Sequence, residues 1–142
     1  LESVKQLRKY QKIETTNQSN GSPLAQFKNF QIDGFEILVG RNAKNNDLLT
    51  LKFAKKDDLW LHARDVSGSH VVIKTKPGQR TPDYVIEQAA SLAAYYSKRK
   101  NDTLAPVILS TKKYVRKIKG TPDGQVKVEK EEVLMVEPKL PT

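Results

Sequence analysis

Residues 58–74 hold the side chains of this chain that are best suited to chemistry. The segment reads DLWLHARDVSGSHVVIK and contains the only tryptophan, Trp60, and both histidines, His62 and His70. Imidazole can transfer a proton near neutral pH, and a carboxylate such as Asp65 can orient it. One hypothesis is therefore an enzyme that acts on RNA or a nucleotide, with His62, Asp65 and His70 as its catalytic groups.

The sequence gives less support to a metal or cofactor site. The two histidines could bind a metal with Asp58 or Asp65, but they are eight residues apart and lack a His-x-Glu pattern or a cysteine partner. The chain has no cysteine, which excludes disulfides and thiolate ligands. Residues 40–42, Gly-Arg-Asn, lack the further glycines and the lysine of a phosphate-binding loop. We expect neither a metal nor a cofactor.

Anion binding is a simpler interpretation of the same residues. Arg41, Arg64 and Lys74 can neutralise phosphates. Ser67 and Ser69, in a turn around glycine, can offer hydroxyl and N–H donors. An exposed tryptophan could stack on an unpaired base, although a lone tryptophan is more often part of a core. We expect binding rather than catalysis.

The charge of the chain also indicates a polyanionic partner. The formal net charge is +9 and the pI is about 9.7. Between residues 98 and 130 there are ten Lys or Arg residues and three Asp or Glu residues. Such a run can be an ordinary solvated surface, but a pI above about 9 with clustered cations favours nucleic acid. The candidate RNA-binding residues are Arg41, Asn42, Arg64, Ser67, Ser69, Lys74, Lys113, Arg116, Lys117 and Lys119.

Residues 58–74 themselves have the pattern of a strand, a turn and a second strand. Apolar residues alternate with Trp60 and His62, a Ser-Gly-Ser turn follows, and Val71–Ile73 begins a second strand. Because alternate residues share a strand face, Trp60 would lie at the buried end and Arg64 at the exposed end. We expect Arg64 and the amides of residues 67–69 to face a ligand. The residues expected to hold the strands and turn are Asp58, Trp60, His62, Gly68 and His70.

The rest of the chain predicts an α+β fold, a mostly antiparallel sheet with one long packed helix at about 82–100. Asp33-Gly34 predicts a hairpin, and Asn45-Asn46-Asp47 predicts the capped start of a short helix. In the long helix Thr81 is the expected cap, Pro82 the first turn, and the cations at 98–100 the end. Alternating residues at 112–118 and the valines at 126–136 predict further strands around a turn at 121–124.

A length of 142 residues fits one domain. Residues 1–26 are expected to be an N-terminal extension and linker, and residues 27–142 the folded domain. The first residue is Leu1, so we expect a piece of a longer protein. No apolar run reaches the roughly 20 residues of a membrane span, and no signal peptide is recognisable. We therefore expect a cytoplasmic protein without a membrane partner.

Several motifs in order resemble the NFACT-R domain, the RNA-binding domain of the NFACT proteins of ribosome quality control. The resemblance runs from about Phe30 to Val136 and includes the helix after Pro82. The family often has proline where Ser67 stands, a departure that leaves the turn possible. The motifs are VGRN at 39–42, NND at 45–47, LT at 49–50, DLWLHA at 58–63, GSHVVI at 68–73 and VRK at 115–117.

This resemblance implies more than the residues alone. Full-length NFACT proteins bind a large ribosomal subunit that carries a stalled, tRNA-linked chain, and they recruit tRNA to extend that chain. The implied partners are tRNA, the rRNA of the large subunit and the remaining domains of the parent protein. Residues 1–11 would then be the end of the coiled coil that precedes this domain in the family.

Overall fold

The computed structural model describes residues 23–141, so the expected linker and coiled-coil end within residues 1–22 lie outside the described part. The expected domain boundary near Phe27 stays a prediction, and Phe27 itself is buried. The elements are η1 (Pro23–Gln26), β1 (Lys28–Ile32), β2 (Phe35–Val39), α1 (Ala43–Leu48), η2 (Leu49–Phe53), β3 (Leu59–Ala63), β4 (Val71–Lys74), α2 (Asp83–Tyr95), β5 (Ala105–Thr111), η3 (Lys112–Tyr114), β6 (Val115–Arg116), β7 (Lys127–Val128) and β8 (Glu132–Val136).

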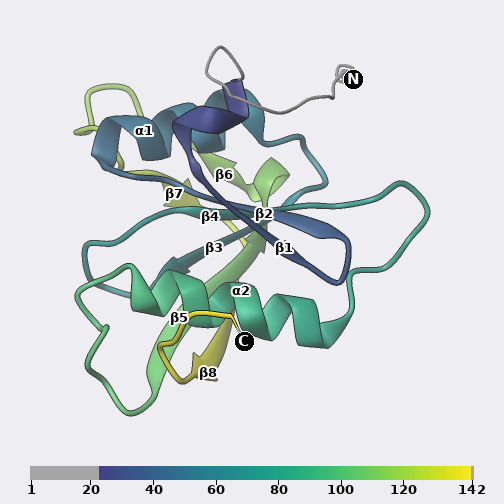
Figure 1. Ribbon diagram of the computed structural model, residues 1–142. Coiled ribbons are helices and arrows are strands. Elements are labelled where there is room, and N and C mark those ends of the chain that lie inside the picture. Colours follow the sequence, from purple (N-terminus) through teal and green to yellow (C-terminus); the bar gives the residue numbers. More distant parts are fainter. Residues whose placement is uncertain (1–22, 142) are drawn as a thin grey trace.

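The main sheet has six strands in the order β1-β2-β4-β3-β5-β8, and every pairing is antiparallel. A separate two-stranded sheet joins β6 and β7. The long helix α2 lies along one side of the main sheet, and α1 lies on the other side (Figure 1). The predicted α+β class is therefore confirmed.

The first hairpin forms where the Asp33-Gly34 pair predicts it. Ile32 pairs with Phe35, so two residues make the turn. Asp33 has φ 54° and Gly34 has φ 81°. Positive φ at both positions matches a type I′ turn, whose twist suits the flanking strands. The hairpin register places Lys28 opposite Val39, directly before the loop to α1.

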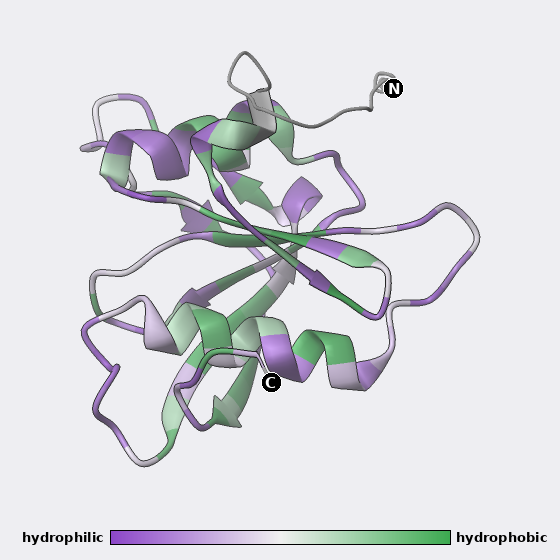
Figure 2. Cartoon of the chain, viewed as in Figure 1, coloured by the Kyte–Doolittle hydropathy of each residue, from purple (hydrophilic) through white to green (hydrophobic). Residues whose placement is uncertain are grey.

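Both faces of the sheet are buried. Ile37, Val39, Leu61, Val71 and Ile73 pack towards α2, while the residues between them pack towards α1 and η2. In Figure 2 the hydrophobic residues accordingly concentrate in the strands and on the sides of the helices that meet them. Alanines at 89, 90, 93 and 94 let α2 approach the sheet closely.

Helix α2 is shorter than predicted and begins differently. Its N-cap is Pro82, in an extended conformation, and Thr81 is buried without capping it. The helix ends at Tyr95 rather than near Lys100. Directly after it, the Ser97 hydroxyl donates to Ala94 O (2.7 Å) and accepts from Arg99 N (3.0 Å). These bonds replace continued helix with a turn, so the three cations at 98–100 lie beyond the helix.

Two other local predictions need correction. The cap of α1 is Asn42, whose side chain accepts from Asn45 N, so the helix begins before the Asn45–Asp47 cluster. The alternating residues at 112–118 give only the two-residue strand β6. Before it, Lys112 N and Lys113 N donate to Asp58 O and Lys56 O, which turns the chain into η3. Within residues 23–141 no helix is long and apolar enough to cross a membrane.

Candidate functional site

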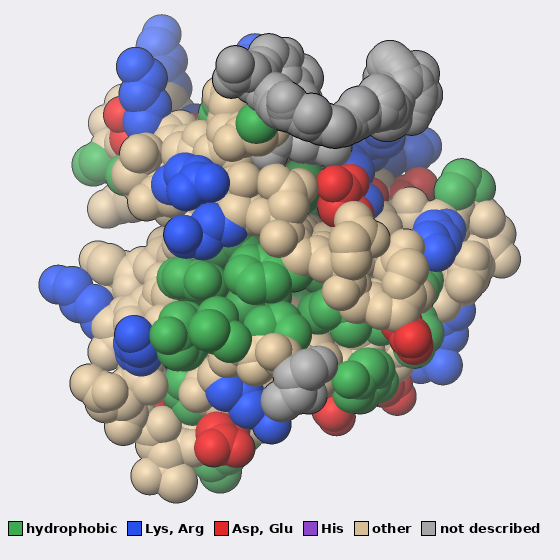
Figure 3. All heavy atoms as spheres, viewed as in Figure 1, with side chains coloured by type: hydrophobic (Ala, Val, Ile, Leu, Met, Phe, Trp, Pro, Cys, Tyr) green, Lys and Arg blue, Asp and Glu red, His purple; other side chains and the backbone are tan. Residues whose placement is uncertain are grey.

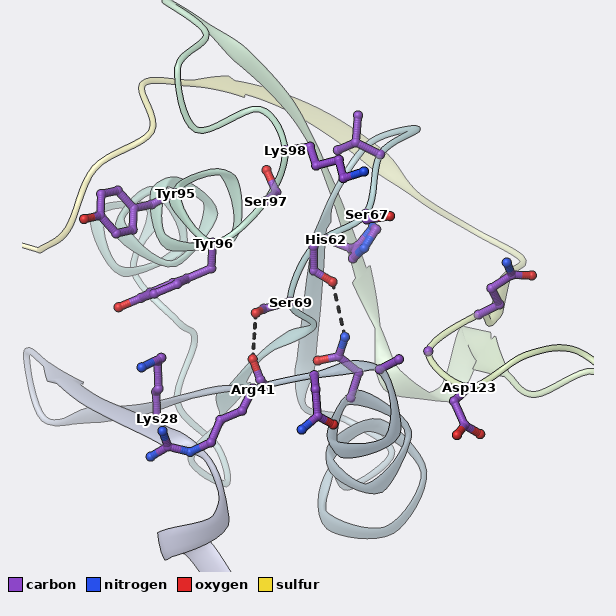
Figure 4. Close-up of a pocket in the computed structure, with 18 of the residues that line it drawn as sticks. Lys28, Arg41, His62, Ser67, Ser69, Tyr95, Tyr96, Ser97, Lys98 and Asp123 are labelled. Atoms are coloured by element: carbon purple, nitrogen blue, oxygen red, sulfur yellow. Dashed lines mark hydrogen bonds between the residues drawn. The ribbon is translucent and has the colours of Figure 1, made fainter.

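An open cleft of about 920 Å³ lies where four connections meet at one edge of the sheet. Its walls are the β2–α1 loop, the β3–β4 loop, the end of α2 with the turn after it, and the turn before β7. Figure 4 shows these segments around the cleft, with Lys28 and Arg41 on one side and Asp123 on the other. Arg41, Asn42, Ser67 and Ser69 from the sequence prediction all line it.

The β3–β4 loop is fastened to the end of α2 by backbone hydrogen bonds. Ser69 N donates to Tyr96 O, and Lys98 N donates to Ser67 O, both at 3.0 Å. A side chain at Gly68 would have no room, because its Cβ would lie 2.6 Å from Ser97 Cβ. Gly68 therefore allows the close contact that forms this wall of the cleft.

The opposite wall is fastened through Asn46, which is buried. Its amide donates to Gly68 O (3.2 Å) and its carbonyl accepts from His70 N (3.1 Å). The Ser69 hydroxyl donates to Gly40 O (2.6 Å). Both Ser69 donors, N–H and O–H, are thus used inside the protein, so the expectation that its amide faces a ligand is corrected. Ser69 positions the cleft wall instead.

Trp60, Thr50 and His70 form a buried hydrogen-bond network beneath the cleft. Trp60 Nε1 donates to Thr50 Oγ1 (3.0 Å), and Thr50 lies 2.7 Å from His70 Nδ1. Because the Gly124 carbonyl can only accept, His70 Nε2 carries a proton and donates to it (2.9 Å). In a neutral ring Nδ1 is then an acceptor, so the Thr50 hydroxyl donates to it. This arrangement requires a neutral His70, and burial, helped by the nearby His62, lowers its pKa to about 4.

The proposed catalytic trio does not assemble. His62 and His70 are close, with ring centroids 5.4 Å apart, but both nitrogens of His70 are occupied by Thr50 and Gly124. Asp65 is exposed and lies 3.5 Å from Arg64 Nε. Burial also lowers the pKa of His62. Among residues 23–141 no group of three metal-ligating side chains is gathered. The geometry favours structural roles for both histidines.

The mouth of the cleft carries cations without carboxylate partners. Arg41 is exposed, and its Nε donates to Gln26 O (3.1 Å), which brings it next to Lys28. Lys28 Nζ lies 5.4 Å from the centre of the Tyr96 ring. Lys98, on the opposite wall, is exposed. None of the three forms an ion pair with another residue in the described part of the chain, so they remain available to an anion.

Two predicted RNA-binding lysines have internal partners. Lys74 Nζ donates to the buried Asp58 (2.5 Å) and to Phe53 O (3.1 Å). Lys117 Nζ donates to Asp47 (2.9 Å), Pro122 O (2.7 Å) and Gln125 O (3.0 Å), so its three protons are used. The geometry assigns these ammonium groups to holding loops together, which sequence spacing cannot distinguish from phosphate binding.

The other predicted cations lie outside the cleft lining. Arg64 is exposed just beyond β3. Lys113 and Lys119 are exposed near β6, and Arg116 pairs with Glu129 at 2.7 Å. These residues can add to the positive field around the domain, but they do not converge with Arg41 on one pocket.

Sequence reasoning missed four residues at the cleft: Lys28, Tyr95, Tyr96 and Lys98. For Lys28 a signal was present, because the Asp33-Gly34 hairpin register places it beside the loop that carries Arg41. The other three depend on where α2 ends. With the helix expected to continue to about residue 100, Lys98 is assigned to the helix terminus, and nothing places the two tyrosines at a turn that faces the cleft.

Comparison with known proteins gives a family match and several similar proteins. Residues 25–130 match the family model described as NFACT protein RNA binding domain. The chain is 39% identical over 110 residues to the Rqc2 homolog RqcH of Bacillus subtilis, and 43% identical over 102 residues to that of Streptococcus suis. These alignments cover 77% and 72% of this chain but only 19% and 18% of the relatives.

Similarity extends to a eukaryotic relative and to a solved structure. The Drosophila melanogaster ribosome quality control complex subunit NEMF homolog is 28% identical over 65 residues, which are 46% of this chain and 7% of that protein. The structure of the C-terminal part of the fibronectin/fibrinogen-binding protein from Streptococcus suis matches with a TM-score of 0.74 and 37% identity, over 93% of this chain and 50% of that one. The chain belongs to the family of NFACT protein RNA-binding domains.

Proposed function

We propose that this domain binds structured RNA, tRNA or rRNA on a stalled large ribosomal subunit, mainly through phosphates. The family membership and the relatives named as ribosome quality control factors support this role. The chain spans about a fifth of the length of its bacterial relatives, so the domain would act together with the remaining domains of a parent protein in the cytoplasm.

The observation that carries the proposal is the group of unpaired cations at the cleft. Lys28 and Arg41 line one side of the cleft and Lys98 lines another, and none of the three forms an ion pair within the described residues. A phosphate in the cleft would give these cations an anionic partner. Asn42 and Ser67 are exposed at the same cleft and can add polar contacts to the RNA backbone.

The more distant cations would act through the overall field. Arg64, Lys113, Arg116 and Lys119 are at least partly exposed and can contact other phosphates of a large RNA. Lys74 and Lys117 would contribute to stability through their internal partners. Phosphate contacts from the exposed cations fix the position of the domain on an RNA but carry little information about base sequence.

Fluorescence anisotropy with labelled tRNA and a labelled rRNA stem-loop tests the proposal. We expect binding that weakens steeply with salt, with log K linear in log salt concentration. Lys28→Ala combined with Arg41→Ala should weaken binding to both RNAs by more than tenfold, since each lost phosphate contact removes roughly 1 kcal/mol or more.

The matched control is Lys139→Ala. Lys139 is exposed after β8 and borders a different depression. Its removal lowers the net charge by one without changing the cleft, so it is compared with Lys28→Ala and Arg41→Ala taken singly. We expect less than a threefold effect from it. Absence of binding to either RNA at low salt, or an equal loss from the control and the cleft variants, would refute the proposal.

A further inference from the structure

Two adjacent tyrosines stand at the edge of the cleft, at the end of α2. The ring centroids of Tyr95 and Tyr96 are 5.1 Å apart and the rings are nearly perpendicular. Tyr96 packs partly against the core beside Phe30, whereas Tyr95 is outside that core cluster. Neither phenol oxygen hydrogen-bonds another residue of the described chain. Figure 4 shows the two rings one above the other, with both hydroxyls directed to the same side.

A lysine lies against each ring. Lys28 Nζ is 5.4 Å from the Tyr96 ring centre, and Lys100 Nζ is 4.3 Å from the Tyr95 ring centre. Neither ammonium group forms an ion pair within residues 23–141. Two neighbouring rings are therefore flanked by two cations, in the order Lys28, Tyr96, Tyr95 and Lys100. On the face that carries α2, Figure 3 shows basic side chains that border a hydrophobic area.

A pair of aromatic rings flanked by cations suits a single nucleic acid strand better than a duplex. Bases of a strand without a partner can stack on rings, and the flanking phosphates can meet the cations. In an RNA duplex the bases are stacked inside and a side chain cannot lie flat against one. Lys28 and Lys100 have flexible stems, so each ammonium group can leave its ring for a phosphate when a base arrives.

We propose that Tyr95 and Tyr96 form a stacking site for an unpaired nucleotide of the bound RNA. Lys28, Arg41 and Lys100 hold the phosphates on either side of that nucleotide. This inference rests on the RNA-binding function proposed above and extends it: the cleft recognises a loop, bulge or end rather than only a duplex backbone. Tyr95 supplies most of the stacking surface, because Tyr96 is partly committed to the core.

The test compares three RNAs of equal length by fluorescence anisotropy with the wild-type chain and its variants. They are a single-stranded decamer with bases, the same strand with abasic sites at its centre, and a duplex. The wild-type chain should bind the base-bearing strand roughly five- to hundredfold more tightly than the abasic strand, as one stacked base implies. Tyr95→Leu should abolish this difference and leave affinity for the abasic strand unchanged.

Two controls separate stacking from folding. Tyr95→Trp keeps an aromatic ring and should restore the preference for bases. Tyr84→Leu changes an exposed tyrosine at the other end of the same helix and should have no effect. Thermal melting of each variant verifies that it is folded.

The outcomes distinguish this inference from the function on which it rests. Equal binding of the base-bearing and abasic strands by the wild-type chain would overturn the stacking site, while phosphate binding would stand. The stacking site would also be overturned if Tyr95→Leu weakened binding to all three RNAs alike, or if the wild-type chain bound tRNA but not the decamer. Failure to bind any RNA at low salt would instead contradict the proposed function.

Discussion

At the scale of single residues, the most unusual side chains of this chain support the fold beneath the cleft. Trp60, Thr50 and His70 are linked by hydrogen bonds that end on Gly124 O, in the turn before β7. Each member satisfies a buried polar atom of the next. This series of hydrogen bonds thereby connects the sheet, η2 and the turn that closes one wall of the cleft.

Thr50→Val should remove both of these hydrogen bonds while it keeps the shape of the side chain. Trp60 Nε1 would lose its acceptor and His70 Nδ1 its donor, both in a buried environment. Leaving a buried polar group unpaired costs about 1–3 kcal/mol, so we expect the free energy of unfolding to fall by about 2–4 kcal/mol. Urea denaturation measures it, with Thr103→Val, at an exposed threonine, as the control. Equal stability of the two variants would contradict the role given to Thr50.

The lowered pKa of His70 predicts a loss of stability in mild acid. Its pKa is about 4 in the folded state and about 6.5 when unfolded, because burial and the nearby His62 and Lys117 disfavour the charged ring more than Asp47 and the Gly124 carbonyl favour it. The unfolded state therefore binds more protons, and stability that is complete above pH 6.5 is lost as the pH falls towards 4. The full effect is about 3 kcal/mol.

Two other groups modify this profile. Burial lowers the pKa of His62 and adds to the loss, whereas burial raises the pKa of Glu36, which opposes it above pH 4.5. Urea denaturation between pH 7.5 and 4.5, with His70→Gln for comparison, measures the dependence. We expect a clearly flatter profile for the variant. A flat profile in the unchanged chain would mean that His70 is charged or exposed in solution.

At the scale of elements, local signals predict what local interactions decide. The Asp33-Gly34 hairpin and the β3–β4 pair follow from turn chemistry and alternation, and the structure confirms both. The end of α2 and the short β6 could not be predicted in the same way. Local bonds of Ser97 begin the turn after α2, but bonds to the distant β3–β4 loop also hold that turn. Likewise, η3 is held by bonds to the loop before β3.

The candidate site was predictable only in part for the same reason. Arg41 and Ser67 follow from residue type and lie at the cleft. Lys74 and Lys117 have the same residue type as a phosphate ligand, yet each is paired with a carboxylate, on Asp58 and Asp47, that is 16 and 70 residues away. Whether a cation is free or paired depends on tertiary contacts that composition does not contain.

The contact between the β3–β4 loop and α2 gives a prediction at this scale. In Gly68→Ala the new Cβ would lie 2.6 Å from Ser97 Cβ and 3.0 Å from Ser97 Cα, so the β3–β4 loop and the turn after α2, which together form this wall, must separate. We expect a stability loss of about 1–3 kcal/mol, together with weaker RNA binding. Gly78→Ala is the control: its Cβ has open space, and only its positive φ of 70° costs stability. RNA binding equal to that of the control would show that this wall is not needed.

At the scale of the whole molecule, the sheet serves as a rigid layer between two cores. Helix α2 covers one face, and α1 with η2 covers the other, so the loops at the sheet edge are held from both sides. The formal net charge of the chain is +9. Cations whose donors are all used by internal acceptors cannot release counterions from an RNA, so the effective charge for binding is smaller than the formal charge.

Arg64 and Lys117 test this distinction between an exposed cation and one held by internal acceptors. The Arg64 side chain is half exposed and forms only a solvent-exposed ion pair with Asp65 (3.5 Å), whereas Lys117 is bonded to three acceptors. Arg64→Ala should weaken binding to all RNA sequences alike and reduce the slope of log K against log salt by about 0.7–0.9, with little change in stability. Lys117→Met should leave that slope unchanged and destabilise the fold, because Asp47 loses its partner. Salt titrations and thermal melts of both variants measure this, and a reduced slope for Lys117→Met would place its ammonium group on the RNA instead.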